Sequence, residues 1–137
     1  MLNRFRIFII FSFIIFVSCK NTNKVNIFSE IGINGLLWKN DSLGCMNYRS
    51  KSIELILERK EFLEKKGTML EVLNYLGKPN YVNSMQNGDI VFIYLIDKSK
   101  YCIDRSLLEN KIMLETRTLY FQISNKKLIK KIGQTIP

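Results

Sequence analysis

Residues 68–79 restrict the fold of this chain more than any other segment. Thr68 and Glu71 have the Ser/Thr-x-x-Glu spacing of a capping box, in which each side chain satisfies a free backbone amide of the other residue. Gly77 permits the left-handed residue that commonly follows a helix, and Pro79 prevents the helix from continuing. The apolar residues between these signals recur at helical spacing: Met69, Val72, Leu73 and Leu76. The segment therefore predicts a short amphipathic helix with one face against another element.

A second helix is expected immediately before it, over residues 51–66. Ile53, Ile56, Leu57 and Leu63 recur at helical spacing, and charged residues occupy most of the remaining positions. Gly67 ends this segment, so that only one residue separates it from Thr68. The spacing indicates a helical hairpin or a sharp elbow that packs on something else.

The other layer is predicted to be a sheet. Residues 90–96 are an unbroken run of β-favouring side chains that follows the turn signal Asn87-Gly88. Residues 119–123 alternate as a half-buried strand, and residues 128–132 return after a turn too short for a parallel crossover. We expect an α+β fold with two short N-terminal helices packed on a three-stranded, or slightly larger, antiparallel sheet. The residues expected to be mostly buried are Val72, Leu73, Leu76, Phe92, Tyr94, Leu119 and Phe121.

The first twenty residues predict export. Arg4 and Arg6 precede residues 7–17, which are 11 residues without a charge. A helix of that length spans roughly 16 Å, about half of a ~30 Å hydrocarbon core, which is typical of a secretory signal rather than a permanent anchor. Ser18 and Cys19 end the run, and this arrangement resembles the lipobox of bacterial lipoproteins. The resemblance implies that residues 1–18 are removed and that Cys19 receives a diacylglyceryl group and an acyl chain such as palmitate.

Two other interpretations of this segment are a short membrane-touching helix and an ordinary cleaved signal. An ordinary signal needs small residues at positions −1 and −3 of its cleavage site, and Phe16 does not fit position −3. Lys20 follows the cysteine in place of an aspartate, which by resemblance to enterobacterial sorting favours the periplasmic face of the outer membrane. We expect residues 19–34 to form a flexible tether, with a docked segment at Ile31 and Ile33, and residues 35–134 to form a single domain.

The chain has three cysteines, so one disulfide leaves one cysteine for another role. If Cys19 holds lipid, Cys45 and Cys102 are left as a pair in an oxidising compartment. A disulfide between them would restrict the unfolded chain by about 4 kcal/mol in the entropy model. Two buried free thiols and a redox-active pair are the alternatives, although no Cys-x-x-Cys motif supports the redox interpretation.

Trp38, Asp41 and Arg49 form a candidate surface site in a short irregular segment. An aromatic ring, a carboxylate and a guanidinium together could bind a partner. The alternative is a loop that lays the one tryptophan over the core, with Asp41 accepting from local backbone amides and Gly44 supplying a positive φ.

Composition excludes several classes of function. The chain has no histidine, which removes imidazole bases and histidine metal ligands, and no nucleophile–base pair or phosphate-binding glycine loop is present. We therefore expect no enzyme, no metal and no cofactor. The formal net charge of +9 would suit nucleic acid, but the export signal does not. Four lysines lie at positions 126, 127, 130 and 131. They either prevent an edge strand from pairing with another chain or bind an anionic membrane surface.

A family resemblance adds to this account. The residues that carry it are Gly67, Thr68, Val72, Leu76, Gly77, Lys78, Pro79, Tyr94, Leu119, Tyr120 and Phe121. Together with the lipobox and tether, roughly residues 53–132 resemble the small outer-membrane-assembly lipoproteins of the SmpA/OmlA type. The resemblance implies a lipid-anchored, non-catalytic scaffold or protein-binding module with an envelope protein as partner, in outer-membrane maintenance. A periplasmic protein that binds a membrane surface or a small ligand is the alternative.

Overall fold

Short helices dominate the first half of the molecule. The computed structural model describes residues 25–97, 102 and 116–136. Five helices occur in the first of these ranges: α1 (Ile27–Glu30), α2 (Gly35–Asn40), α3 (Tyr48–Glu58), α4 (Lys60–Lys66) and α5 (Met69–Leu76). The signal segment and the lipidation site Cys19 lie outside the described residues.

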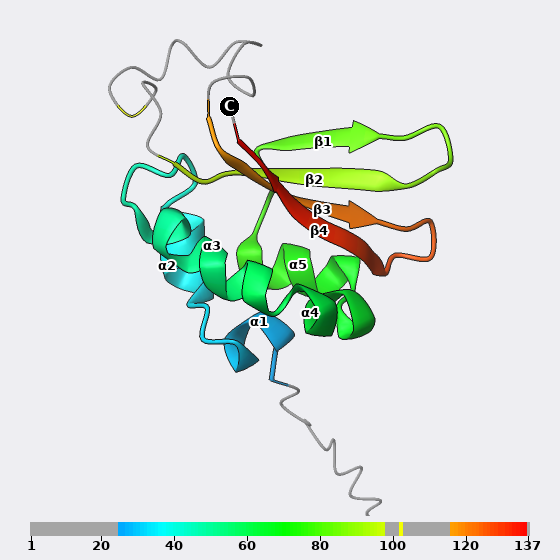
Figure 1. Ribbon diagram of the computed structural model, residues 1–137, viewed down its shortest axis with the longest axis horizontal. Helices are drawn as coiled ribbons and strands as arrows, with labels where there is room; N and C mark the ends of the chain where they lie inside the picture. Colours follow the sequence, from blue (N-terminus) through cyan, green and yellow to red (C-terminus); the bar gives the residue numbers. More distant parts are fainter. Residues whose placement is uncertain (1–24, 98–101, 103–115, 137) are drawn as a thin grey trace, which may run out of the picture.

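The strands form one antiparallel sheet. They are β1 (Tyr81–Ser84), β2 (Ile90–Leu95), β3 (Thr118–Ile123) and β4 (Ile129–Thr135), in the spatial order β1-β2-β3-β4. In the register, Phe92 pairs with Phe121, which in turn pairs with Ile132. The helices all lie on one side of the sheet (Figure 1), so the fold is α+β in two layers.

The core lies between these layers because alternate side chains of each strand point toward the helices. The buried apolar side chains include Phe28, Trp38, Ile53, Ile56, Leu63, Val72, Leu76, Phe92, Tyr94, Leu119, Phe121 and Ile132. Six of the seven side chains predicted to be buried are buried, and Leu73 is partly buried against the same cluster. Aromatic edges meet at its centre, where the ring of Tyr94 lies 5.9 Å from that of Phe121 at an interplanar angle of 89°.

The predicted start of α5 is confirmed in detail. The Thr68 hydroxyl accepts a hydrogen bond from the Glu71 amide at 3.2 Å, and the Glu71 carboxylate accepts one from the Thr68 amide at 3.0 Å. Gly77 takes a positive φ of 79° after the helix. The predicted helix over residues 51–66 is interrupted at Arg59, whose φ of −101° separates α3 from α4.

The sheet is larger than the three strands named in the prediction. Strand β1 was not expected, and it forms a hairpin with β2 through the Asn87-Gly88 turn, where the Gly88 amide donates to the Met85 carbonyl at 3.0 Å. β1 is four residues long and mostly exposed, so it is too short to show a clear alternation of buried and exposed residues.

The domain also begins earlier than predicted. Ile27, Phe28 and Ile33 are at most 3% exposed and belong to the core, so residues 27–34 are not a free tether. Asn26 caps α1 by accepting from the Phe28 amide at 3.0 Å. The expected docking of Ile33 is confirmed, and Ile31 is partly buried.

Candidate functional site

The loop between α2 and α3 is organised by one carboxylate. Asp41 ends α2, and its two oxygens accept hydrogen bonds from the amides of Met46, at 2.7 Å, and Arg49, at 2.9 Å. Gly44 has a φ of 71°, and a Cβ there would lie 2.5 Å from the Ile96 carbonyl oxygen. The loop therefore closes on itself around Asp41 and packs its backbone directly on the end of β2.

Arg49 projects from α3 into the space that this loop encloses. Its Nε donates to the Trp38 carbonyl at 3.1 Å, and its Nη1 lies 2.9 Å from the Ser42 carbonyl and 3.1 Å from the Leu95 carbonyl. The Asn80 side-chain oxygen lies 3.0 Å from the same nitrogen. One guanidinium thus joins α2, the following loop, the entry to β1 and the end of β2.

Two aromatic rings flank this cation. The centre of the guanidinium lies 5.0 Å from the centroid of the Trp38 ring and 5.4 Å from that of Tyr94. Both distances fit cation–π contacts, which are stronger in a desolvated site. Burial lowers the pKa of Arg49 to about 10, although the negative charge of Asp41 opposes this change, so the group stays charged at neutral pH. Burial likewise raises the pKa of Tyr94, whose hydroxyl donates to the Gly77 carbonyl at 2.8 Å.

The structure brings Trp38, Asp41 and Arg49 together, but they do not form a surface site. Their exposed fractions are 0%, 1% and 1%. The hydrogen bonds of the Asp41 carboxylate and the Arg49 guanidinium described above go to groups of this chain, so both charges are engaged in holding the loop. The surface interpretation is therefore wrong, and the alternative, a loop that packs an aromatic ring on the core, describes what is seen.

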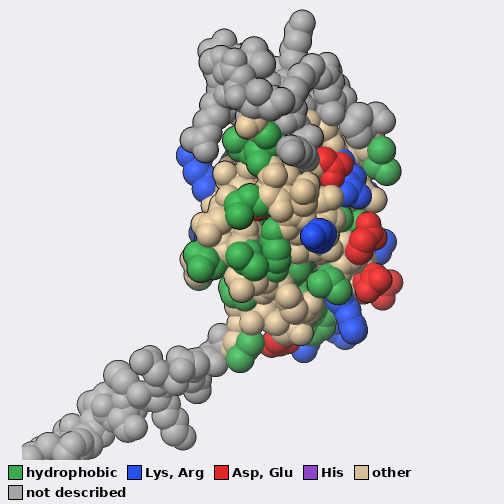
Figure 2. Space-filling view, turned by 90° about the vertical axis from the view of Figure 1, so that its left-hand side faces the viewer, with side chains coloured by type: hydrophobic (Ala, Val, Ile, Leu, Met, Phe, Trp, Pro, Cys, Tyr) green, Lys and Arg blue, Asp and Glu red, His purple; other side chains and the backbone are tan. Residues whose placement is uncertain are grey.

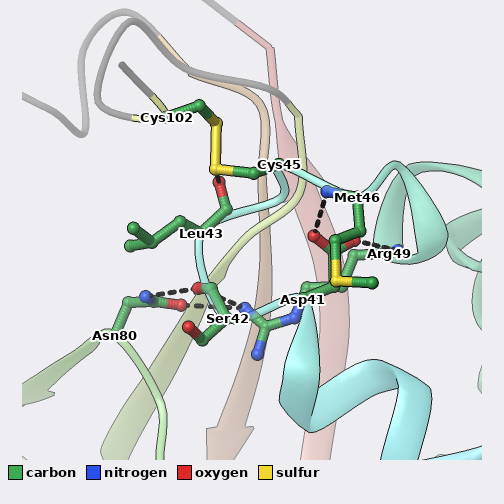
Figure 3. The surroundings of a disulfide bond; sticks show 8 residues. All are labelled: Asp41, Ser42, Leu43, Cys45, Met46, Arg49, Asn80 and Cys102. Carbon is green, nitrogen blue, oxygen red and sulfur yellow. Dashed lines mark hydrogen bonds between the residues drawn. A yellow bond between two sulfur atoms is a disulfide. The ribbon is translucent and has the colours of Figure 1, made fainter. Parts of the chain in front are cut away.

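The predicted disulfide is confirmed. Cys45 and Cys102 are bonded with their Cα atoms 5.5 Å apart, and Figure 3 shows the bond beside the Asp41–Arg49 loop. Cys45 belongs to that loop and Cys102 lies beyond β2 in the sequence. The crosslink therefore ties the loop that Asp41 and Arg49 organise to a position seven residues beyond the end of β2.

A second polar group links α3 to the sheet, and the sequence analysis missed it. Arg117 donates to both oxygens of Asp97, at 3.1 Å and 2.9 Å, and its Nη2 also lies 3.2 Å from the Ser50 hydroxyl. Asp97 follows β2 and Arg117 precedes β3, so the pairing of Leu95 with Thr118 brings them together. Only the register of that strand pair could have identified them.

The four lysines at positions 126, 127, 130 and 131 differ in their contacts. Lys130 donates to Asp89 at 2.9 Å, and Gln122 donates to the same carboxylate oxygen at 2.8 Å. These hydrogen bonds, that from Lys130 first, hold the pKa of Asp89 below its ordinary value. Lys126, Lys127 and Lys131 are exposed.

An open cleft of about 480 Å³ lies beside α2 and is lined by Ile33, Leu36, Lys39 and Tyr75 among others. Lys39 donates to the Asn74 carbonyl at 2.8 Å and the Tyr75 hydroxyl to the Ile33 carbonyl at 2.8 Å. Figure 2 shows the face that carries α2, where hydrophobic side chains are dispersed among polar ones. Among the described residues, no three acidic or sulfur side chains gather into a group that could hold a metal ion.

Comparison of the chain with protein-family models, curated proteins and solved structures finds no significant match. Within the described part of the chain, the helices are too short or too polar to cross a membrane.

Proposed function

We propose that the protein is a lipid-anchored lipoprotein of the bacterial envelope whose domain is a non-catalytic scaffold or protein-binding module. In this proposal residues 1–18 are a removed signal and Cys19 carries the lipid. The domain is held at the periplasmic face of the outer membrane and serves outer-membrane maintenance, as the resemblance to the SmpA/OmlA-type lipoproteins implies.

The observation that carries the proposal is the use of the cysteines. Cys45 and Cys102 are bonded to each other, so Cys19 is the one cysteine of the chain left without a disulfide partner. Structural disulfides are typical of exported proteins. The remaining cysteine, Cys19, comes directly after a small residue at the end of an apolar run that resembles a signal. Export and lipidation together account for all three thiols.

The surface that we assign to a protein partner is the face around α2. Leu36 and Leu37 of this helix are 68% and 40% exposed, and Met46 in the following loop is 62% exposed. Leu36 also lines the neighbouring cleft. Arg49 is bonded to the Trp38 carbonyl of α2 and to the Ser42 carbonyl of the loop, and the disulfide restrains Cys45 of the same loop, so fewer conformations need to be lost on binding.

Metabolic labelling with a palmitate analogue tests the proposal. The wild-type chain should incorporate the label, Cys19→Ala should not, and the control Cys45→Ala should keep it. A Cys19→Ala chain labelled as strongly as the wild type would overturn the lipid assignment. A partner crosslinked in cells should be lost on Leu36→Asp but kept on the exposed control Glu58→Gln.

The alternative function, binding to an anionic membrane surface, is favoured by the exposed lysines at the start of β4. Each lysine near such a surface contributes about 1 kcal/mol. Binding of the chain without lipid to anionic vesicles should then weaken strongly as salt is raised. Binding that is absent at low salt would exclude this alternative.

A further inference from the structure

The chain enters the domain beside the start of α5. The Asn26 side-chain amide donates to the Glu71 carbonyl at 3.3 Å, so residue 26 lies against the first turn of this helix, and Val25 before it is 56% exposed. Cys19 is seven residues before Asn26, and seven residues of fully extended chain span at most about 24 Å. A lipid on Cys19 would therefore keep this part of the domain within that distance of the bilayer.

The turn between β3 and β4 meets the same end of α5. The Met69 amide donates to the Lys127 carbonyl at 2.8 Å, and Thr68 and Leu128 form an isolated antiparallel bridge. The turn is itself closed by the Lys127 amide, which donates to the Ser124 carbonyl at 2.8 Å. The start of α5 and this turn are therefore held together next to the point where the chain enters the domain.

Exposed side chains of two kinds gather at this junction. Leu70, in the first turn of α5, is 63% exposed, and Leu128 is 50% exposed. Lys126 and Lys127 in the turn are exposed as well. We call these four side chains the junction patch. Membrane binding of a protein surface grows with the apolar area that it buries and with the attraction of its lysines to anionic headgroups, and the junction patch offers both.

The acidic side chains beside the junction patch are held by the backbone. The Glu71 carboxylate accepts from the Thr68 amide at 3.0 Å, and the Glu64 carboxylate accepts from the Ile132 amide at 2.6 Å. Both glutamates are partly buried, whereas both lysines of the patch are exposed. The patch therefore presents a positive charge to its surroundings, which complements an anionic surface.

We infer that the anchored domain lies on an anionic bilayer through the junction patch, with its leucines in the boundary between headgroups and acyl chains and its lysines among the headgroups. The inference rests on the lipid anchor of the proposed function, and it adds which face of the domain touches the membrane. The anchor favours the bilayer as the occupant, because the chain enters the domain beside the patch. The face around α2 lies at the other end of α5, where Lys39 donates to the Asn74 carbonyl at 2.8 Å, so the two surfaces do not coincide.

A fluorescent label at the tip of the turn tests this orientation without altering the patch. The lipidated chain with Asn125→Cys carries an environment-sensitive dye in vesicles of equal parts phosphatidylglycerol and phosphatidylcholine, and the matched control is Asn40→Cys at the end of α2. Both asparagines are exposed. Relative to vesicles of phosphatidylcholine alone, the emission of the dye at position 125 should shift to the blue and be quenched by nitroxide-labelled lipids, whereas the dye at position 40 should show neither effect.

The intact mass of the same sample separates the anchor from the orientation. Equal quenching at the two positions, in a chain whose mass includes the lipid, would overturn the docking and leave the anchor intact. A chain without lipid would overturn the anchor and, with it, this orientation.

The lysines of the patch should carry the electrostatic part of the docking. Lys126→Gln combined with Lys127→Gln, in the Asn125→Cys background, should lower the ratio of docked to undocked domain about 25-fold, because each lysine near an anionic surface contributes about fivefold. The control Lys51→Gln combined with Lys60→Gln removes the same charge from α3 and α4, and should change the ratio far less. A decrease of the same size in both pairs would show attraction by the net charge alone and would overturn docking through the patch.

The leucines should carry the apolar part of the docking. Leu70→Gln should lower the same ratio roughly tenfold, because burial of a leucine side chain contributes about that factor. Leu36→Gln on α2 removes a leucine of similar exposure and should leave the ratio unchanged. Unchanged quenching in Leu70→Gln and in the patch-lysine pair, with both chains folded by circular dichroism, would contradict the inference.

Discussion

Arg49 and Arg117 both join the helical layer to the sheet, but they do so in different surroundings. Arg49 is 1% exposed and gives its hydrogen bonds to carbonyl and amide oxygens, between two aromatic rings. Arg117 keeps 23% of its side-chain surface exposed and forms a forked ion pair with Asp97, whose side chain is 41% exposed. The comparison shows that carbonyl and amide dipoles from several elements can hold a buried cation. Removal of such a cation should lower the free energy of unfolding strongly. An ion pair near water contributes little.

Removal of Arg49 should have the largest effect. Arg49→Ala leaves three backbone carbonyls and the Asn80 side chain without this donor and opens a cavity beside Trp38. We expect the free energy of unfolding to fall by about 4 kcal/mol in urea titration, because each unsatisfied buried group costs about 1–3 kcal/mol. Arg49→Lys retains the charge but not the planar fork, and should lose about 2 kcal/mol. A loss below about 1 kcal/mol in Arg49→Ala would remove the distinction between the two arginines.

Loss of the disulfide should come next. A chain with Cys45 and Cys102 both replaced by alanine frees a loop of sequence separation 57, and we expect a loss of about 3–4 kcal/mol. Because the disulfide and Arg49 both restrain the loop between α2 and α3, combining these changes with Arg49→Ala should cost less than the sum of the separate losses. Strict additivity in a double-mutant cycle would show that the two devices act independently.

Alkaline pH should lower the stability of the folded chain through Tyr94, whose ring lies beside Arg49. Its pKa is raised by burial, so above about pH 10 the unfolded chain releases this phenol proton while the folded chain keeps it. Stability from this group is therefore complete below about pH 10 and is lost as the pH rises above that value. Tyr94→Phe should cost about 1 kcal/mol at pH 8 through the lost hydrogen bond to Gly77. The difference from wild type should shrink by pH 11, and a constant difference across that range would contradict the burial of the phenol.

Arg117→Ala should have the smallest effect. A partly exposed ion pair contributes about 0.5–1 kcal/mol, and salt screens it. We expect the loss to fall by about half in 1 M NaCl, whereas the loss caused by Arg49→Ala should not change. Equal salt sensitivity of the two losses would show that both cations are solvated to the same degree.

The sequence predicted those helices, turns and strands whose signals lie within a few neighbouring residues. The Thr68–Glu71 capping box, the Asn87-Gly88 turn and the apolar run of β2 are each specified within a few positions. Strand β1 was missed because it is only four residues long and mostly exposed, although a tight turn before β2 needs a strand on both sides. The docking of Phe28 was missed because it stands in a polar, asparagine-rich stretch.

The sequence drew attention to the three residues of the site and left two interpretations open, a surface site and a loop packed on the core, of which the second is what the structure shows. Trp38, Asp41 and Arg49 are close together in the sequence, yet charged side chains are almost always exposed unless they are paired. The partners that allow Arg49 to be buried are mainly backbone carbonyls, among them that of Leu95, 46 residues away. A backbone carbonyl leaves no mark in the sequence, and neither does the strand register that joins Asp97 to Arg117.

The lipid anchor and the disulfide together are the central claim, and the intact mass of the protein from native membranes tests both. We predict a chain that begins at Cys19 and carries a diacylglyceryl group and an acyl chain. It should accept no alkylating reagent until it is reduced, and then two alkyl groups. A chain that begins at Met1, an unmodified Cys19, or alkylation at Cys45 and Cys102 before reduction would contradict the account.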